Sequence, residues 1–147
     1  MAFVLTREMS ILRGLVYTLA QLLGATAGAG LLYITLPSQF DDQQYLSTTH
    51  LGDGVSAVRG CLYEIIMTFF LIFVVLNVAV IPAIPKENMK PVMPIVIGFV
   101  IIAMIFLGGP LTGASMNPAR SFGPALINNY WDSHWVGYPT LPSFLYV

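Results

Sequence analysis

An asparagine and an arginine stand close together in the longest weakly charged part of the chain. Asn117 precedes Arg120 by three positions, and Arg120 is the only Lys or Arg between Lys90 and the C-terminus. A charge within an apolar segment is costly, so such residues usually face an aqueous path or a polar partner. A second interpretation is open here, because an arginine at a membrane surface extends its guanidinium to the lipid headgroups. The pair therefore indicates either a polar pathway or an interfacial anchor.

The residues around Asn117 predict a short helix with an irregular approach. Four residues that favour a helix break precede it: Gly108, Gly109, Pro110 and Gly113. Asn117 suits an N-cap and Pro118 the first helical position. The helix that follows, at roughly 117–127, is too short for a bilayer crossing of about 20 residues. Irregular apolar backbone followed by a short helix indicates a re-entrant element, which survives at membrane depth only inside protein or beside a watery cavity.

Three long stretches must position these residues, and each is apolar enough to cross a membrane. They lie at roughly 12–36, 59–84 and 91–109, with an outer loop at about 37–57. Glu64 is the only acidic residue in the second stretch and needs a buried partner there.

Small residues recur along the first stretch at a spacing that permits close helix contact. They form two stripes: Ala20, Gly24 and Gly28, and beside them Ala25 and Ala29. Lipid supplies little hydrophobic drive for helix association, so close packing must supply the attraction. Small residues allow it because they let two backbones approach. This face is therefore expected to be a seam between helices, either within a bundle or between subunits.

The composition is that of a membrane protein. Of 147 residues, 9% are charged, against roughly 25% in soluble domains, and the mean hydropathy is +0.78. With a net charge of −1, nothing favours nucleic acid as a partner. Cys61 is the only cysteine, and no metal-ligand spacing, phosphate loop or Ser/His/Asp grouping is present. The prediction is an all-α membrane protein that is not an enzyme and needs no cofactor.

A long segment resembles a motif of one membrane-protein family. Thr112 to Leu126, which reads TGASMNPARSFGPAL, is similar to the second Asn-Pro-Ala motif of the aquaporins, or major intrinsic proteins. Segments 20–25, 63–66 and 128–135 also resemble aquaporin elements, so the likeness extends to Trp135. It implies a partial aquaporin-like bundle with three transmembrane helices and one re-entrant half-helix, in residues 1–147.

The resemblance also implies a role for each residue of the motif in passive water transport. Asn117, followed by Pro118 and Ala119, would donate its amide to passing water, and Arg120 would repel cations at the constriction. Acceptor carbonyls would come from the residues just before the motif: Gly113, Ala114, Ser115 and Met116. Glu64 would support this loop by accepting from its backbone N–H groups.

Selectivity is expected to follow from three positions of the same pattern. Ser121, where glycerol-conducting members usually carry Asp, favours the water-type branch. Ile105 and Ala114 occupy filter positions that are more polar in strict water channels, which resembles tonoplast-type members permeable to ammonia. We therefore expect water with some ammonia or hydrogen peroxide passage. Ile105 has an alternative role, which is simply to pack within the third stretch.

The family has six spans and two such motifs, whereas this sequence contains one Asn-Pro-Ala and a tail, 136–147, that departs from the pattern. We therefore expect the full-length parent, in its family's tetrameric form, to pass water and small neutral solutes, and this chain alone to be a non-conducting fragment. The alternative is a non-conducting membrane protein that associates with intact aquaporins through Gly24 and Gly28.

Overall fold

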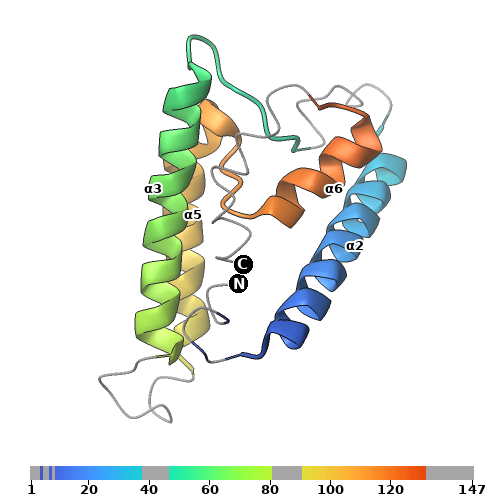
Figure 1. Ribbon diagram of the computed structural model, residues 1–147. Helices are drawn as coiled ribbons and strands as arrows, with labels where there is room; N and C mark the ends of the chain where they lie inside the picture. Colours follow the sequence, from blue (N-terminus) through green and yellow to red (C-terminus); the bar gives the residue numbers. More distant parts are fainter. Residues whose placement is uncertain (1–3, 5–6, 8, 38–46, 81–90, 132–147) are drawn as a thin grey trace.

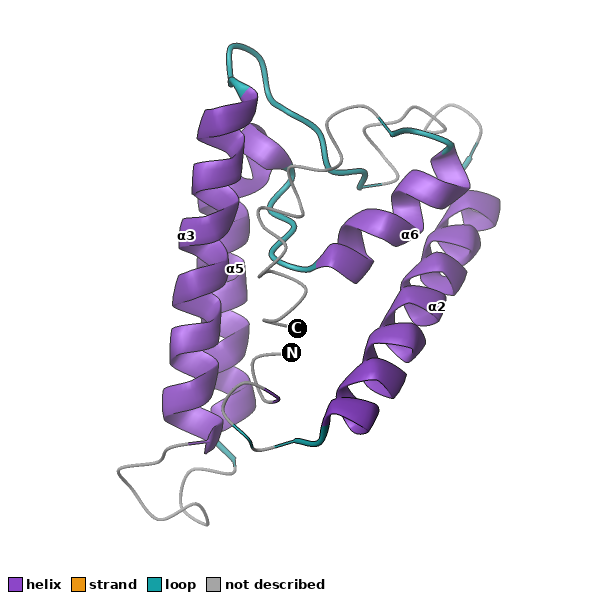
Figure 2. Cartoon of the chain, in the orientation of Figure 1, coloured by secondary structure: helices purple, strands orange, loops and turns teal. Residues whose placement is uncertain are grey.

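The computed structural model describes residues 4, 7, 9–37, 47–80 and 91–131. Their main elements are α2 (Ile11–Thr35), α3 (Ala57–Val75), the π-helical turn η2 (Leu76–Val80), α5 (Met93–Thr112) and α6 (Pro118–Asn128). The described part contains helices and loops without a strand (Figure 2). The expected tail at 136–147, the loop segment 38–46 and the end of the second predicted span at 81–84 lie outside the described residues.

The first long helix, α2, begins and ends where its sequence requires. The Ser10 hydroxyl accepts from the N–H of Arg13 at 3.5 Å and caps the first turn. The helix ends at Thr35, two residues before Pro37, because the residue before a proline disfavours helical backbone. Within the helix, Thr18 and Thr26 donate to the carbonyls four residues earlier, at 2.9 Å each. These bonds satisfy the hydroxyls without a partner from another helix.

The helices α3 and α5 lie side by side and form the second wall of the molecule, opposite α2 (Figure 1). The first of them continues through the π-helical turn η2, where the Asn77 amide donates to the Phe73 carbonyl at 2.7 Å. α2, α3 with η2, and α5 are each long and apolar enough to cross a membrane. The predicted all-α membrane fold is confirmed.

The short helix α6 lies between these two walls and packs along α2 (Figure 1). From the end of α5 the chain descends into the molecule, turns at residues 113–117, and returns along α2 toward the end at which α5 stopped. With 11 residues, α6 reaches only about 16 Å at roughly 1.5 Å per residue, about half of a hydrocarbon core. The half-helix is therefore re-entrant in form.

The expected break at Gly108, Gly109 and Pro110 does not occur. α5 continues to Thr112 and ends at Gly113, whose φ of 80° requires the left-handed backbone that glycine adopts freely. The reason lies in packing. A Cβ on Gly108 would overlap the sulfur of Met67, so this glycine lets α3 approach α5. Its missing side chain serves helix contact and does not interrupt the helix.

The seam between α2 and α6 uses one of the two predicted stripes. A Cβ on Gly123 of α6 would lie 2.5 Å from the carbonyl carbon of Ala25, so the two backbones touch there. Ala29, one turn along the same stripe, is buried. No described atom lies within 4 Å of a Cβ at Gly24 or Gly28, so these two glycines make no close contact within the described chain, and a seam between subunits there stays a prediction. The close contact between α2 and α6 is therefore made by the alanine stripe.

Replacing Gly123 with alanine is expected to separate α6 from α2. The added methyl would overlap backbone atoms of Ala25, which cannot rotate away, so the cost should reach about 2 kcal/mol or more. Thermal unfolding of the purified chain in detergent measures it. Gly98→Ala in α5 is the matched control, because a Cβ there meets no described atom within 4 Å. Equal melting temperatures for the two variants would contradict the close contact.

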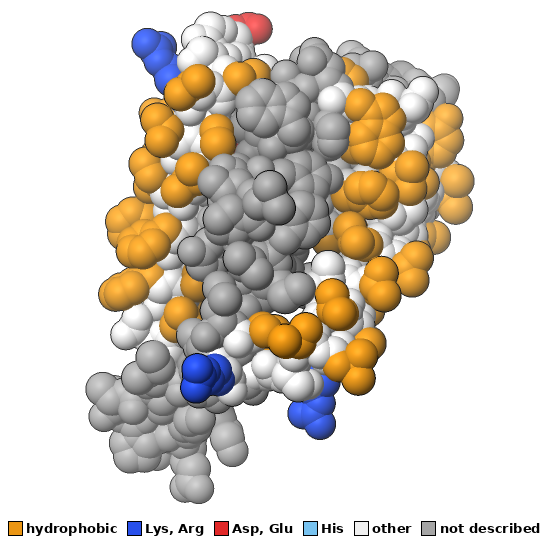
Figure 3. Space-filling model, viewed as in Figure 1, with side chains coloured by type: hydrophobic (Ala, Val, Ile, Leu, Met, Phe, Trp, Pro, Cys, Tyr) orange, Lys and Arg blue, Asp and Glu red, His pale blue; other side chains and the backbone are white. Residues whose placement is uncertain are grey.

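The outward faces of the long helices are strongly apolar. Figure 3 shows hydrophobic side chains spread over both walls of the molecule. Large apolar residues on every long helix are exposed, among them Leu12, Phe69 and Phe106, the last of which is 81% exposed. In water such a surface would drive association, whereas lipid chains solvate it.

Candidate functional site

The N-terminus of α6 is capped by the side chain of Asn117. Its Oδ1 accepts from the N–H of Ala119 at 2.9 Å, and Pro118 occupies the first helical position, where no N–H is needed. Because only the oxygen of the amide can accept this bond, its orientation is fixed. The Nδ2 group is thereby the part of Asn117 that remains to donate.

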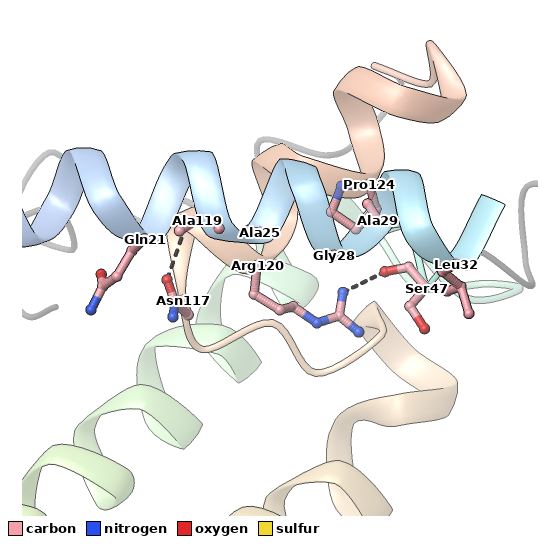
Figure 4. A pocket seen from close by; sticks show the side chains of 11 residues that line it. Gln21, Ala25, Gly28, Ala29, Leu32, Ser47, Asn117, Ala119, Arg120 and Pro124 are labelled. Carbon is pink, nitrogen blue, oxygen red and sulfur yellow. Dashed lines mark hydrogen bonds between the residues drawn. The ribbon is translucent and has the colours of Figure 1, made fainter. Parts of the chain in front are cut away.

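Asn117 lines a cavity of about 470 Å³ between α2 and α6. Figure 4 shows its side chain beside Gln21 of α2, with Arg120 farther along the same hollow. The remaining lining is mostly small and apolar, and comprises Gly24, Ala25, Gly28, Ala29, Leu32, Ser47, Ala119 and Pro124. The cavity thus joins an apolar wall to three polar donors, which are the amides of Gln21 and Asn117 and the guanidinium of Arg120.

Two backbone carbonyls from distant segments hold the guanidinium of Arg120. Its Nη1 donates to the Ser47 carbonyl at 2.6 Å, and its Nη2 donates to the Gly113 carbonyl at 3.0 Å (Figure 4 draws the Ser47 bond). Arginine has five N–H donors in a planar fork, so it reaches both carbonyls at once. The two hydrogen bonds hold the positive charge of Arg120 at the cavity.

The loop that leads to α6 has a strained backbone. Ala114 and Met116 have φ values of 47° and 52°, a region that residues with a Cβ rarely adopt. Each such residue costs about 1–3 kcal/mol and persists only where the surroundings enforce it. Ser115, between them, is buried together with Ala114. The loop therefore needs strong anchors.

Glu64 of α3 supplies these anchors. Its carboxylate is fully buried and accepts from the N–H groups of Ser115 and Met116 at 2.9 and 2.8 Å. The Thr112 hydroxyl donates to the same carboxylate at 2.5 Å. Three donors suit an ionised carboxylate, which only accepts. The structure thus brings Glu64 to the loop amides, as the family resemblance implied.

Neither of the two residues expected to tune the filter lines this cavity. Ala114 is buried with its methyl toward Gly108 of α5, and it does not line the cavity of Asn117 and Arg120. Ile105 lies on α5, half exposed, and does not line it either. The Gly113 carbonyl, expected to accept hydrogen bonds from water, accepts one from Nη2 of Arg120. The site as described therefore joins Asn117, Ala119 and Arg120, while Ile105 and Ala114 stand apart.

Sequence reasoning missed the outer loop. The Thr49 side chain is fully buried and contacts Ser121, and the neighbouring Ser47 carbonyl binds Arg120. These contacts join residues more than 70 positions apart. A Ser/Thr segment in a loop gives no local signal of such a role, because these residue types are common in loops.

Comparison with known proteins identifies similar chains. A sequence model described as "Major intrinsic protein" matches residues 1–140. A "Probable aquaporin TIP-type" of Medicago truncatula is 42% identical over 129 residues, which cover 88% of this chain and 48% of that protein. "Probable aquaporin TIP3-2" of Arabidopsis thaliana is 39% identical over 88% of this chain and 46% of its own length. "Aquaporin C" of Dictyostelium discoideum is 40% identical over 90% and 47%. The chain spans about half the length of the curated relatives it matches.

Proposed function

Because this chain belongs to the major intrinsic protein family, we propose that its half-helix and loop form one half of a passive pore for water. The protein is an integral, multi-pass membrane protein, and its relatives carry the name aquaporin. Transport through such a pore is diffusion, with no covalent step, so no enzymatic role is proposed.

The placement of Asn117 carries this proposal. Its Oδ1 is used by the N-cap, so Nδ2 donates toward the cavity and can hold the oxygen of a water molecule. The N-terminus of α6, with its partial positive charge, begins at the same point and favours the same orientation of the water. A water molecule held by its oxygen turns its hydrogens away, which interrupts proton transfer along a file of water. Arg120 adds a barrier to cations.

We propose further that a conducting pore needs a wall and a donor beyond those in the described residues. The cavity wall is built from α2, α6 and the outer loop, and the sequence holds one Asn-Pro-Ala. We expect the second donor and the opposite wall to come from a further aquaporin half. In this view the chain alone passes no water, whereas the joined protein passes water and small neutral solutes and assembles as a tetramer.

A chimera tests this proposal directly. The matched segment of the Medicago truncatula relative is replaced with this chain, and the relative's remaining half is retained. Osmotic shrinkage of vesicles is followed for the chimera, for this chain alone and for empty vesicles. We expect faster shrinkage with the chimera only. A folded chimera without flux would refute the pore proposal, and flux from the chain alone would refute the need for a second half.

Replacing Asn117 with aspartate separates its two functions. Aspartate is an equally good N-cap, so α6 should remain intact. The donor that faces the cavity becomes a charged acceptor, and water loses its oxygen contact. We expect water flux through the chimera to fall about tenfold or more, as for the loss of about 1.4 kcal/mol. Circular dichroism checks the helix content, and unchanged flux with an intact helix would contradict the donor role.

Replacing Ile105 with histidine tests the proposed ammonia passage. Ile105 lies half exposed on α5, on a surface that a second half could cover. If it faces the completed pore, a polar ring should narrow the opening and reduce ammonia flux more than water flux. The chimera with and without the substitution is measured for both solutes. An equal effect on the two fluxes would indicate that Ile105 only packs within its helix.

A second candidate function is supported by the face of α2 that carries Gly24 and Gly28 and lines the cavity. A methyl group placed on Gly24 or Gly28 would have no described atom within 4 Å, so a partner helix could approach there. In this alternative the chain binds intact aquaporins and does not conduct. Co-purification of full-length relatives with the chain, lost in a Gly24→Leu/Gly28→Leu variant, would favour this alternative, provided that the chimera shows no flux.

A further inference from the structure

A continuous chain of hydroxyl groups links the outer loop to the start of the half-helix. The Thr49 Oγ1 lies 2.6 Å from the Ser121 Oγ, which lies 2.5 Å from the Ser115 Oγ. The Ser115 hydroxyl in turn donates to the Asn117 carbonyl at 2.9 Å. Thr49 and Ser121 are fully buried, and Ser115 is nearly so. The chain thus ties together three segments: the outer loop, the re-entrant loop and α6.

The two ends of this chain determine the direction of each bond within it. The Asn117 carbonyl only accepts, so the single proton of Ser115 is used there. Ser121 must then donate to Ser115, and Thr49 must donate to Ser121. At the other end, Nη1 of Arg120 lies 3.5 Å from the Thr49 oxygen and only donates. All bonds therefore run in one direction, from a cation to a carbonyl, an order in which each bond polarises the next.

Thr49 also positions the carbonyl that binds Arg120. Ser47, two residues earlier, is itself exposed, with a φ of 58°, so burial does not hold it. Its carbonyl nevertheless lies 2.6 Å from Nη1 of Arg120. The side chains of Thr48 and Thr49, which follow Ser47, are both buried and anchor this part of the loop, and Thr49 is the one that joins the hydroxyl chain. Neither Thr49 nor Ser121 lines the cavity.

We propose that Thr49 and Ser121 are positioning residues, which hold Arg120 and Asn117 in a fixed relation through the hydroxyl chain. The outer loop is then part of the permeation filter, although these two side chains never touch the permeating water. The proposal rests on the proposed pore function for its consequence in transport. Its structural content, that the hydroxyl chain immobilises Arg120, does not depend on flux.

The accessibility of Arg120 to an arginine reagent tests the structural content. The purified chain in detergent is treated with phenylglyoxal, and mass spectrometry follows modification of Arg120 against the exposed Arg13 and Arg59. We expect Thr49→Val and Ser121→Ala each to raise the Arg120 rate about three- to tenfold, as for loss of one net hydrogen bond. The double variant should exceed neither single variant, because a chain broken once is already interrupted.

Two further variants make the result specific. Thr49→Ser keeps the hydroxyl and should restore the native rate, while Thr18→Val removes a threonine hydroxyl from α2, remote from this chain, and should change nothing. An unchanged Arg120 rate in Thr49→Val would overturn the proposal. A rise of the Arg120 rate to that of the exposed Arg13 and Arg59, together with loss of helix content by circular dichroism, would also overturn it, since it would show general loss of the fold.

The consequence for transport is measured separately in the chimera. We expect Thr49→Val to raise the ratio of urea to water permeability about threefold or more, and Thr49→Ser to restore it. A raised Arg120 reactivity with an unchanged ratio would overturn the role in the filter while leaving the pore proposal intact. A chimera that conducts in no variant would instead refute the pore function, and the labelling result would still decide whether the hydroxyl chain immobilises Arg120.

Discussion

Replacing Glu64 with alanine is expected to release the re-entrant loop and to destabilise the chain more than any of the other substitutions proposed above. The change leaves the buried N–H group of Ser115 and the part-buried N–H group of Met116 without acceptors, at about 1–3 kcal/mol for the buried group and less for the other. It also removes the anchor that keeps Ala114 and Met116 at positive φ. Since whole domains are stable by only about 5–15 kcal/mol, the loss is a large share of the total.

Hydrogen exchange followed by mass spectrometry measures this effect locally. Peptides that contain residues 113–117 should exchange faster by a factor of ten for about every 1.4 kcal/mol lost. Glu64→Gln is the matched control, because one oxygen still accepts while the new amide faces a donor, so its effect should be intermediate. If Glu64→Ala exchanged at the native rate in this loop, the carboxylate would not be its anchor.

The elements of the fold could be predicted because they depend on local composition. Long uncharged stretches predict helices in lipid, where the backbone has no other donors or acceptors to bond with. The N-cap at Asn117 was likewise local, since Asn followed by Pro is a common helix start. Composition predicted the wrong end for α5, because glycine breaks helices in water but in this molecule makes room for Met67.

The direction in which each helix faces could not be read from α2 alone. Both small-residue stripes fit the spacing that favours helix contact, and only Gly123, almost 100 residues later, selects the alanine stripe. The role of Glu64 came from a family resemblance, because the sequence separates it from Ser115 by 51 residues. Contacts of this range have no local signature, and the same holds for the hydroxyl chain through Thr49.

These long-range contacts converge on the short segment 113–123. Glu64 holds it from α3, Thr49 and Ser47 hold it from the outer loop, and the Ala25 backbone supports it through Gly123. A re-entrant backbone at membrane depth needs such support from all sides, since lipid offers its polar groups no partner. The same contacts fix the positions of the donors in this segment, and the proposed pore would use these donors to discriminate between small solutes.

Replacing Arg120 with valine is expected to abolish the exclusion of cations by the proposed pore and to widen its opening. The guanidinium would no longer fill the space between the carbonyls of Ser47 and Gly113. Both carbonyls would lose the N–H donor of Arg120 and become free acceptors. We expect methylammonium and urea permeability of the chimera to rise about tenfold each, as for the loss of a charged hydrogen bond of about 1.5 kcal/mol, with water flux nearly unchanged.

Arg120→Lys separates the charge of this residue from its size. A lysine keeps the positive charge, so methylammonium should stay excluded by repulsion. Its single ammonium lacks the planar fork that spans the Ser47 and Gly113 carbonyls, so the opening should still widen and urea should pass. Stopped-flow measurements with both solutes distinguish these effects. If lysine admitted methylammonium as readily as valine does, the exclusion of cations would depend on the fit of the guanidinium and not on its charge.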